Sequence, residues 1–181
     1  MKTYEFSIVG SGLDPNAVDY ESRFYDHGCS DATVSFQRGH TILDFAREAL
    51  SFEDAIATAV DHVRRAGCKV DRIEPDPLVS LAEIAGRVGM SRAVMTQYSK
   101  GQRGGNNFPA PTARVTSTSP LWMWADVAKW LFKNHKISRD EAMEAEAVRQ
   151  ANEVLSSDAP QFAGKLRERV RERELAMCEA A

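Results

Sequence analysis

Apolar and polar residues alternate in four short runs in the first part of the chain. Two runs, 4–8 and 32–36, alternate cleanly, whereas 43–45 and 70–73 are shorter or less regular. A period of two is typical of strands with one buried face. The pattern predicts four strands.

Two helices are expected between these strands. Ala17, Tyr20 and Phe24 share one face of the first, and residues 52–63 carry apolar side chains at the helical i, i+3, i+4, i+7 spacing, with Ser51 as N-cap. The order βαββαβ predicts a ferredoxin-like sandwich of the α+β class, with the first and third strands in the centre of the sheet. Cys29 and Cys68 would then lie near opposite edges, too far apart to bridge.

The middle of the chain predicts two short helices that cross. Residues 81–88 form the first, with Ser80 as N-cap, and Gly89-Met90-Ser91 breaks it. Arg92–Lys100 form the second, with Met95 and Tyr98 facing back onto the first. This is a helix-turn-helix pattern.

The span resembles the helix-turn-helix of MerR-type and excisionase-type winged-helix DNA-binding domains. The resemblance rests on Ala85, Gly89, Ser91, Met95 and Tyr98 and covers about a third of the chain. It implies that segments 100–111 and 119–124 are the wing and its return strand. It also implies binding to double-stranded DNA.

The charge distribution favours the same partner. The formal net charge is −3, but residues 1–77 carry 8 basic against 14 acidic side chains, residues 78–136 carry 8 against 2, and residues 137–181 carry 7 against 10. Acidic flanks repel phosphate, so DNA is expected to bind the middle segment only.

The period of the second short helix predicts which side chains read DNA. With Met95 and Tyr98 inward, four residues turn outward as base readers: Arg92, Ala93, Thr96 and Gln97. Five more are expected at phosphates or in the wing: Ser91, Lys100, Gln102, Arg103 and Arg114. The Gly104-Gly105 backbone is expected to approach phosphates closely, and Arg114 to lie in the first wing strand. Trp122, Trp124 and Trp130 are expected to pack in a core rather than stack on bases.

A helical tail follows. Ser138–Glu141 reads as a capping box that opens a helix to about Leu155, and another helix begins near Pro160. Phe162, Leu166 and Val170 form an apolar stripe on it, which predicts either a dimer seam or a helix that folds back on its own domain, unless the helix frays. With Pro75-Asp76-Pro77 as a linker, the expected domains are 1–77, 78–136 and 137–181.

The residues favour no catalytic, metal or cofactor site. Three scattered cysteines form no C-x-x-C pair, and Asp26-His27-Gly28-Cys29 lacks a second pair of metal ligands. Asp44, Arg47 and Glu48 are charged and close in sequence, which is more typical of a salt-bridged strand end than of an active site. No apolar run spans a membrane and no targeting peptide is recognised, so a cytoplasmic protein is expected.

These patterns predict a non-enzymatic, sequence-specific regulator of transcription that binds double-stranded DNA, as a bacterial repressor or autoregulator, and forms a homodimer. One alternative is an excisionase-like factor that bends DNA. Another is an antitoxin-like protein that also binds a protein partner. The N-terminal domain is expected to bind an effector, a protein or a second copy, and its fold does not choose among them.

Overall fold

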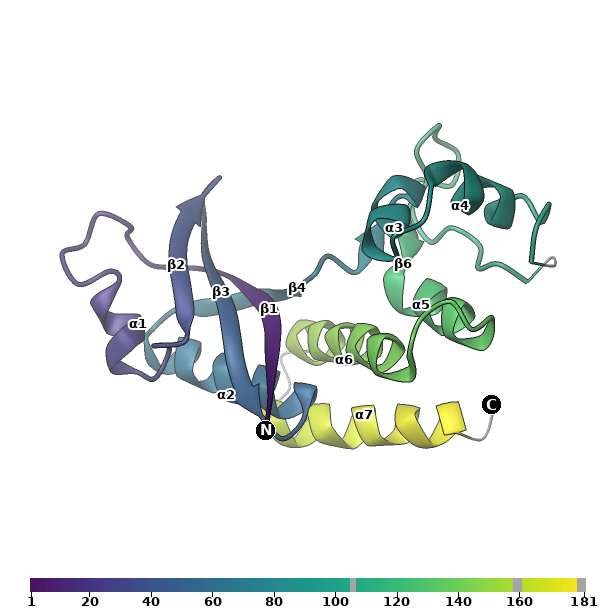
Figure 1. The fold of residues 1–181 in the computed structure, drawn as a ribbon. Helices are drawn as coiled ribbons and strands as arrows, with labels where there is room; N and C mark the ends of the chain where they lie inside the picture. The colour runs from purple at the N-terminus through teal and green to yellow at the C-terminus, as the bar shows by residue number, and fades with distance from the viewer. Residues whose placement is uncertain (105–106, 158–160, 179–181) are drawn as a thin grey trace. The chain divides into compact units, whose positions relative to one another are not determined.

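The computed structural model describes residues 1–104, 107–157 and 161–178 (Figure 1). Within these ranges the chain is of mixed α and β structure, with seven helices, a four-stranded antiparallel sheet and a small two-stranded sheet. It divides into two compact units. The sheet unit comprises Met1–Pro75 and Ala147–Met177, and the helical unit comprises Asp76–Glu146 and the chain from Cys178.

The division agrees in part with the expected domains. The boundary between Pro75 and Asp76 falls within the expected linker. The tail forms no third unit among the described residues, because most of it is grouped with the N-terminal sheet. No helix in the described part of the chain is long and apolar enough to cross a lipid bilayer.

The large sheet contains β1 (Lys2–Ser11), β2 (Ala32–Gln37), β3 (His40–Ala49) and β4 (Lys69–Glu74), in the order β2-β3-β1-β4. The first and third strands are central, as expected. β1 includes Gly10 and Ser11, although Gly10-Ser11-Gly12 is a sequence typical of a turn. The backbone of β4 comes very close here, since a Cβ on Gly10 would lie 2.8 Å from the Lys69 carbonyl oxygen.

Two helices join these strands. α2 (Phe52–Arg65) is capped by Ser51, whose hydroxyl accepts from the Asp54 N–H at 3.3 Å. It packs on one face of the sheet, where the Phe52 ring meets Phe6 edge-on at 5.8 Å. α1 spans only Ser22–Asp26, so the expectation that Ala17 and Tyr20 lie in this helix was wrong. Asp14 accepts from the Asn16 N–H, a local turn that competes with helix.

A buried arginine ties the end of β3 to the loop before β2. Arg47 donates to both carboxylate oxygens of Asp31, at 2.7 and 2.8 Å, and to the Gly28 carbonyl at 2.9 Å. The salt-bridged interpretation of this strand end is therefore confirmed for Arg47. Asp44 and Glu48 do not take part, because Asp44 bonds to Ser7 and both are exposed while Arg47 is buried.

This ion pair controls the ionisation of Asp31. Burial alone would raise the pKa of this carboxyl, but the hydrogen bond and the charge of Arg47 outweigh burial and hold the pKa below 3.8. Burial raises the pKa of the Cys29 and Cys68 thiols to about 11, and Cys29, Cys68 and Cys178 are all unpaired. The two buried thiols are therefore poor nucleophiles.

The last two helices are α6 (Arg139–Ser156) and α7 (Phe162–Cys178). The expected capping box is present, since the Ser138 N–H donates to Glu141 at 2.7 Å and the Glu141 N–H donates to the Ser138 hydroxyl at 3.2 Å. The Ser138 hydroxyl also donates to the Glu141 carboxylate, at 2.7 Å, and this bond and the one from the Ser138 N–H lower the pKa of Glu141.

The apolar stripe of α7 is buried within its own chain. Phe162, Leu166 and Val170 are all buried. Two polar contacts tie α7 to α2: Arg167 bonds to Asp54 at 2.6 Å, and the Arg64 guanidinium lies 5.5 Å from the centre of the Phe162 ring. A stripe covered in this way offers no apolar surface to a partner, so the expectation of a dimer seam here was wrong and the fold-back alternative holds.

We expect Leu166→Ala to lower the free energy of unfolding by about 2–5 kcal/mol, because it opens a cavity under a fully buried side chain. It should leave the oligomeric state unchanged. Denaturant titration and light scattering measure the two quantities. If the variant is as stable as the wild type but light scattering shows a different oligomeric state, the stripe is a dimer interface after all.

We expect Asp31→Asn to lower the free energy of unfolding by about 1–3 kcal/mol at neutral pH, because it leaves the buried Arg47 without its anion. The folded state lowers the pKa of Asp31, so its contribution is complete above 3.8 and is lost as the pH falls through the folded value. Unfolding curves of both proteins should therefore converge in acid. Asp61→Asn, which removes an exposed pair with Arg65, is the control. An Asp31→Asn effect equally large in strong acid would contradict the assignment.

Candidate nucleic-acid interface

Two short helices of the helical unit form the predicted helix-turn-helix. α3 spans Leu81–Arg87, and Ser80 and Glu83 cap it reciprocally: the Glu83 N–H donates to the Ser80 hydroxyl and the Ser80 N–H to the Glu83 carboxylate. Gly89 has a φ of 64°, and the Met90 N–H donates to the Ala85 carbonyl at 2.9 Å. This left-handed turn ends α3 and redirects the chain.

α4 (Arg92–Ser99) follows with Ser91 as its N-cap, since the Ser91 hydroxyl accepts from the Val94 N–H at 3.3 Å. Met95 and Tyr98 are buried, as are Ile84 and Ala85 of α3. The inward anchors were therefore predicted correctly. Lys100 is the C-cap rather than part of the helix.

Three of the four expected base readers are exposed on α4. Arg92, Ala93 and Gln97 lie open to solvent, and Ala93 and Gln97 are one turn apart. Thr96 is half-buried, and its hydroxyl donates to the Arg92 carbonyl at 2.9 Å. The proton of the Thr96 hydroxyl is therefore bonded within the helix, and Thr96 is less open to a base than predicted.

The chain leaving α4 is held against an aromatic cluster. A Cβ on Gly104 would lie 3.0 Å from the Tyr98 ring and 3.2 Å from the Trp130 ring, and its φ is 74°. This glycine therefore packs on the two rings with one side but is itself exposed, so the expectation that its backbone approaches phosphate stays a prediction. Its partner in that expectation, Gly105, lies outside the described residues.

This anchored loop presents polar side chains at the C-terminal end of α4. Lys100, Gln102 and Arg103 are exposed. The Gln102 N–H donates to the Gln97 carbonyl at 2.9 Å, and the Arg103 guanidinium lies 5.7 Å from the centre of the Tyr98 ring. These contacts hold the loop that carries Lys100, Gln102 and Arg103 beside the exposed face of α4.

The predicted wing is less regular than expected. β5 (Leu78–Val79) pairs with β6 (Trp122–Met123), and a single bridge joins Ala113 to Leu121. Arg114 follows that bridge in a left-handed conformation, φ 52°, so it opens the exposed tip instead of lying in a strand as predicted. Its carbonyl accepts from the Ser117 N–H at 2.9 Å, which closes the tip.

The tryptophans form a core, as predicted. Trp122, Trp124 and Trp130 are buried, and Trp124 begins α5 (Trp124–Lys133), which limits the return strand to two residues. Phe108 meets Trp130 edge-on at 5.0 Å, and the Trp122 indole N–H donates to the Pro109 carbonyl at 3.0 Å. Their rings are therefore not available to stack on bases.

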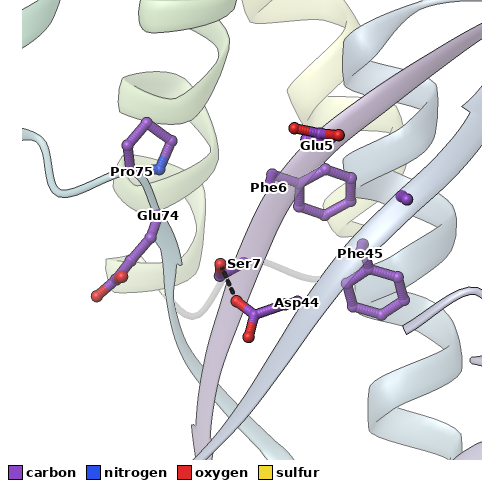
Figure 2. Close-up of a pocket in the computed structure, with 8 residues that line it drawn as sticks. Glu5, Phe6, Ser7, Asp44, Phe45, Glu74 and Pro75 are labelled. Atoms are coloured by element: carbon purple, nitrogen blue, oxygen red, sulfur yellow. Dashed lines mark hydrogen bonds between the residues drawn. The ribbon is translucent and has the colours of Figure 1, made fainter. Parts of the chain in front are cut away.

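The sheet unit carries a different kind of surface. A hollow of about 620 Å³ lies on the open side of the sheet, and Figure 2 shows Glu5, Asp44 and Glu74 around it. The Ser7 hydroxyl donates to Asp44, and Arg72 holds Glu74 at 2.7 Å. Among the described residues no group of three or more acidic, histidine or cysteine side chains has a geometry that could hold a metal ion. These carboxylates repel phosphate, so this surface does not suit a nucleic acid.

The helical unit therefore brings together Arg92, Ala93 and Gln97 on one helix face, with Lys100, Gln102 and Arg103 at its end, whereas Arg114 lies on a separate tip. The clamp of Gly104 on Tyr98 and Trp130 was missed from the sequence. The only sequence feature that could have indicated this contact is the pair Gly104-Gly105 shortly after the buried Tyr98. Neither a family model, nor a curated protein, nor a solved structure matches this chain.

Proposed function

We propose that the protein is a sequence-specific regulator of transcription, non-enzymatic and cytoplasmic, that binds double-stranded DNA through α4. The observation that carries the proposal is the exposed face of Arg92, Ala93 and Gln97, on a helix whose opposite face is anchored by buried Met95 and Tyr98. In this proposal the helical unit is a winged helix-turn-helix and the sheet unit a ferredoxin-like domain, the latter supported by its strand order.

The dimensions and chemistry of α4 suit the major groove. An α-helix with its side chains is about 10–12 Å across, comparable with the width of that groove. Arginine pairs in a bidentate manner with guanine and glutamine with adenine, and a methyl group such as that of Ala93 contacts thymine. A helix face with these three groups can therefore distinguish base pairs.

The polar and cationic side chains that follow α4 suit the phosphate backbone. Lys100, Gln102 and Arg103 follow directly from the exposed face, and the packing of Gly104 restricts where their loop can go. Contacts to phosphate fix the register of a protein on DNA without reading its sequence. In this proposal the loop positions the protein on the phosphate backbone, and α4 reads the base pairs.

One observation favours excisionase-like bending as a second candidate. The exposed tip after Ala113 carries Arg114 next to Val115, whose exposed fraction is 62%. Minor-groove binders combine a cation with an apolar side chain that wedges between bases and kinks the duplex. Fluorescence transfer between the ends of a bound duplex measures bending, and Val115→Ser should reduce it if this candidate is correct.

We expect Arg92→Ala to weaken binding to the preferred duplex by about 1–3 kcal/mol and to relax the preference at one base pair. Selection from a random duplex library identifies that sequence, and titration of single-base variants measures the effect. Arg92→Lys keeps the charge but not the bidentate geometry, so it should also relax the preference. A library with no enriched sequence would contradict the proposal, and a uniform loss of affinity would reassign Arg92 to phosphate.

We expect Lys100→Ala and Arg103→Ala to weaken binding to all duplexes alike and each to reduce the slope of log affinity against log salt by about one. Lys69→Ala, which removes an exposed cation of the sheet unit, is the control and should leave the slope unchanged. Titrations at several salt concentrations give the slopes. Equal slopes for the loop variants and the wild type would remove this loop from the interface.

A further inference from the structure

The two edges of the large sheet differ in how their backbone groups are satisfied. At the β4 edge, the carboxamide of Asn152 accepts from the Ile73 N–H at 2.8 Å and donates to the Ile73 carbonyl at 2.9 Å. This side chain occupies the place of a neighbouring strand. At the opposite edge, β3 is the only strand beside β2 among the residues that the structure describes (Figure 1).

The register shows which groups of β2 point outward. Pairs alternate between hydrogen-bonded and non-hydrogen-bonded in an antiparallel ladder. The Ala46 N–H donates to the Asp31 carbonyl, so Thr33, Ser35 and Gln37 also bond toward β3. The N–H and carbonyl groups of Val34 and Phe36 therefore point away from the sheet, and within the described ranges no backbone group pairs with them.

This edge lacks the features that usually protect one. Exposed edges commonly carry charged residues, proline or a bulge that discourage pairing. β2 reads Ala-Thr-Val-Ser-Phe-Gln, with no charge and no proline, and its register with β3 is regular. Phe36 is 43% exposed on this strand. Such an edge is a template for another strand.

A side chain at the centre of β2 also lacks a partner. The Ser35 hydroxyl oxygen is buried and has no hydrogen-bond partner within the described part of the chain. A buried hydroxyl without a partner is unfavourable by about 1–3 kcal/mol. A neighbouring strand that brought a second hydroxyl to this point would remove that penalty.

We propose that β2 is the self-association surface of this protein and pairs antiparallel with β2 of a second copy, about a two-fold axis at Ser35. In this register Val34 exchanges both of its free backbone hydrogen bonds with Phe36 of the second copy, and Phe36 does the same with Val34 of the second copy. The two Ser35 residues face each other as a non-hydrogen-bonded pair, with Cα atoms about 4.5 Å apart, so that their hydroxyls can bond after rotation about Cα–Cβ.

The sequence and geometry of β2 favour pairing with a second copy of this chain over pairing with a different protein. A two-fold axis through an antiparallel pair makes the strand complementary to itself at every position, including the Val34 side chain beside a Phe36 ring. An uncharged strand offers nothing to a partner that is recognised by charge.

Light scattering on the full chain tests the proposal. The wild type should be a dimer, and Phe36→Lys should raise its dissociation constant at least about tenfold, because a charge at a paired edge opposes pairing. Leu50→Lys makes the same kind of change at a side chain that is 83% exposed outside β2, and should leave the dimer intact. A monomeric wild type at about 0.1 mM, or a Phe36→Lys variant that dimerises normally, would overturn the proposal.

Oxidative cross-linking tests the register and needs no destabilised variant. In a Cys178→Ser background, which removes the exposed thiol, Ser35→Cys should form an intermolecular disulfide because the facing Cα atoms lie within disulfide range. Thr33→Cys is the matched control on the same strand and the same face. Its copies would lie about 13 Å apart in this register, so it should not cross-link. Equal cross-linking of both variants, or none at Ser35→Cys, would overturn the register and with it the two-fold pairing.

Discussion

The helical unit depends on the contact between Tyr98 and Trp130, whose ring centres lie 5.0 Å apart. Tyr98 lies on α4 and Trp130 on α5, so this edge-on pair joins the helix that carries Arg92 and Gln97 to the helix that closes the unit. Phe108 packs on the same indole, and Gly104 packs on both rings. The position of α4 and the path of the loop after it follow from one cluster.

That cluster explains why a short helix can present side chains in fixed positions. A helix of 8 residues is marginal in isolation, because few backbone hydrogen bonds offset the cost of nucleation. Met95 and Tyr98 supply packing on one side, and the Ser91 cap satisfies a free N–H group at its start. Arg92, Ala93 and Gln97 remain exposed on the other side of the helix.

The sequence predicted elements better than the contacts between distant segments. The sheet order and α2 follow from alternation and helical spacing, which act over a few residues, and so do the caps at Ser51, Ser80 and Ser138. The contacts of Asn152 and Gly104 do not follow from such short-range patterns. Asn152 bonds to a strand 79 positions earlier, and Gly104 reads as a flexible loop residue until Trp130 is placed beside it. The Phe162 stripe left two interpretations open, since an apolar stripe shows that a helix is covered but not by what.

The absence of charge on β2 is unusual because the rest of its domain is strongly acidic. The first 77 residues carry 14 acidic side chains, and the open face of the sheet bears several of them around its hollow. In a domain of this composition an edge could readily carry a carboxylate, which would discourage pairing at little expense to the fold. β2 has none, whereas the β4 edge is closed by a side chain from α6. An edge left uncharged and open in an acidic domain is best explained by a strand that pairs with it, and the strand that fits without further assumption is its own copy.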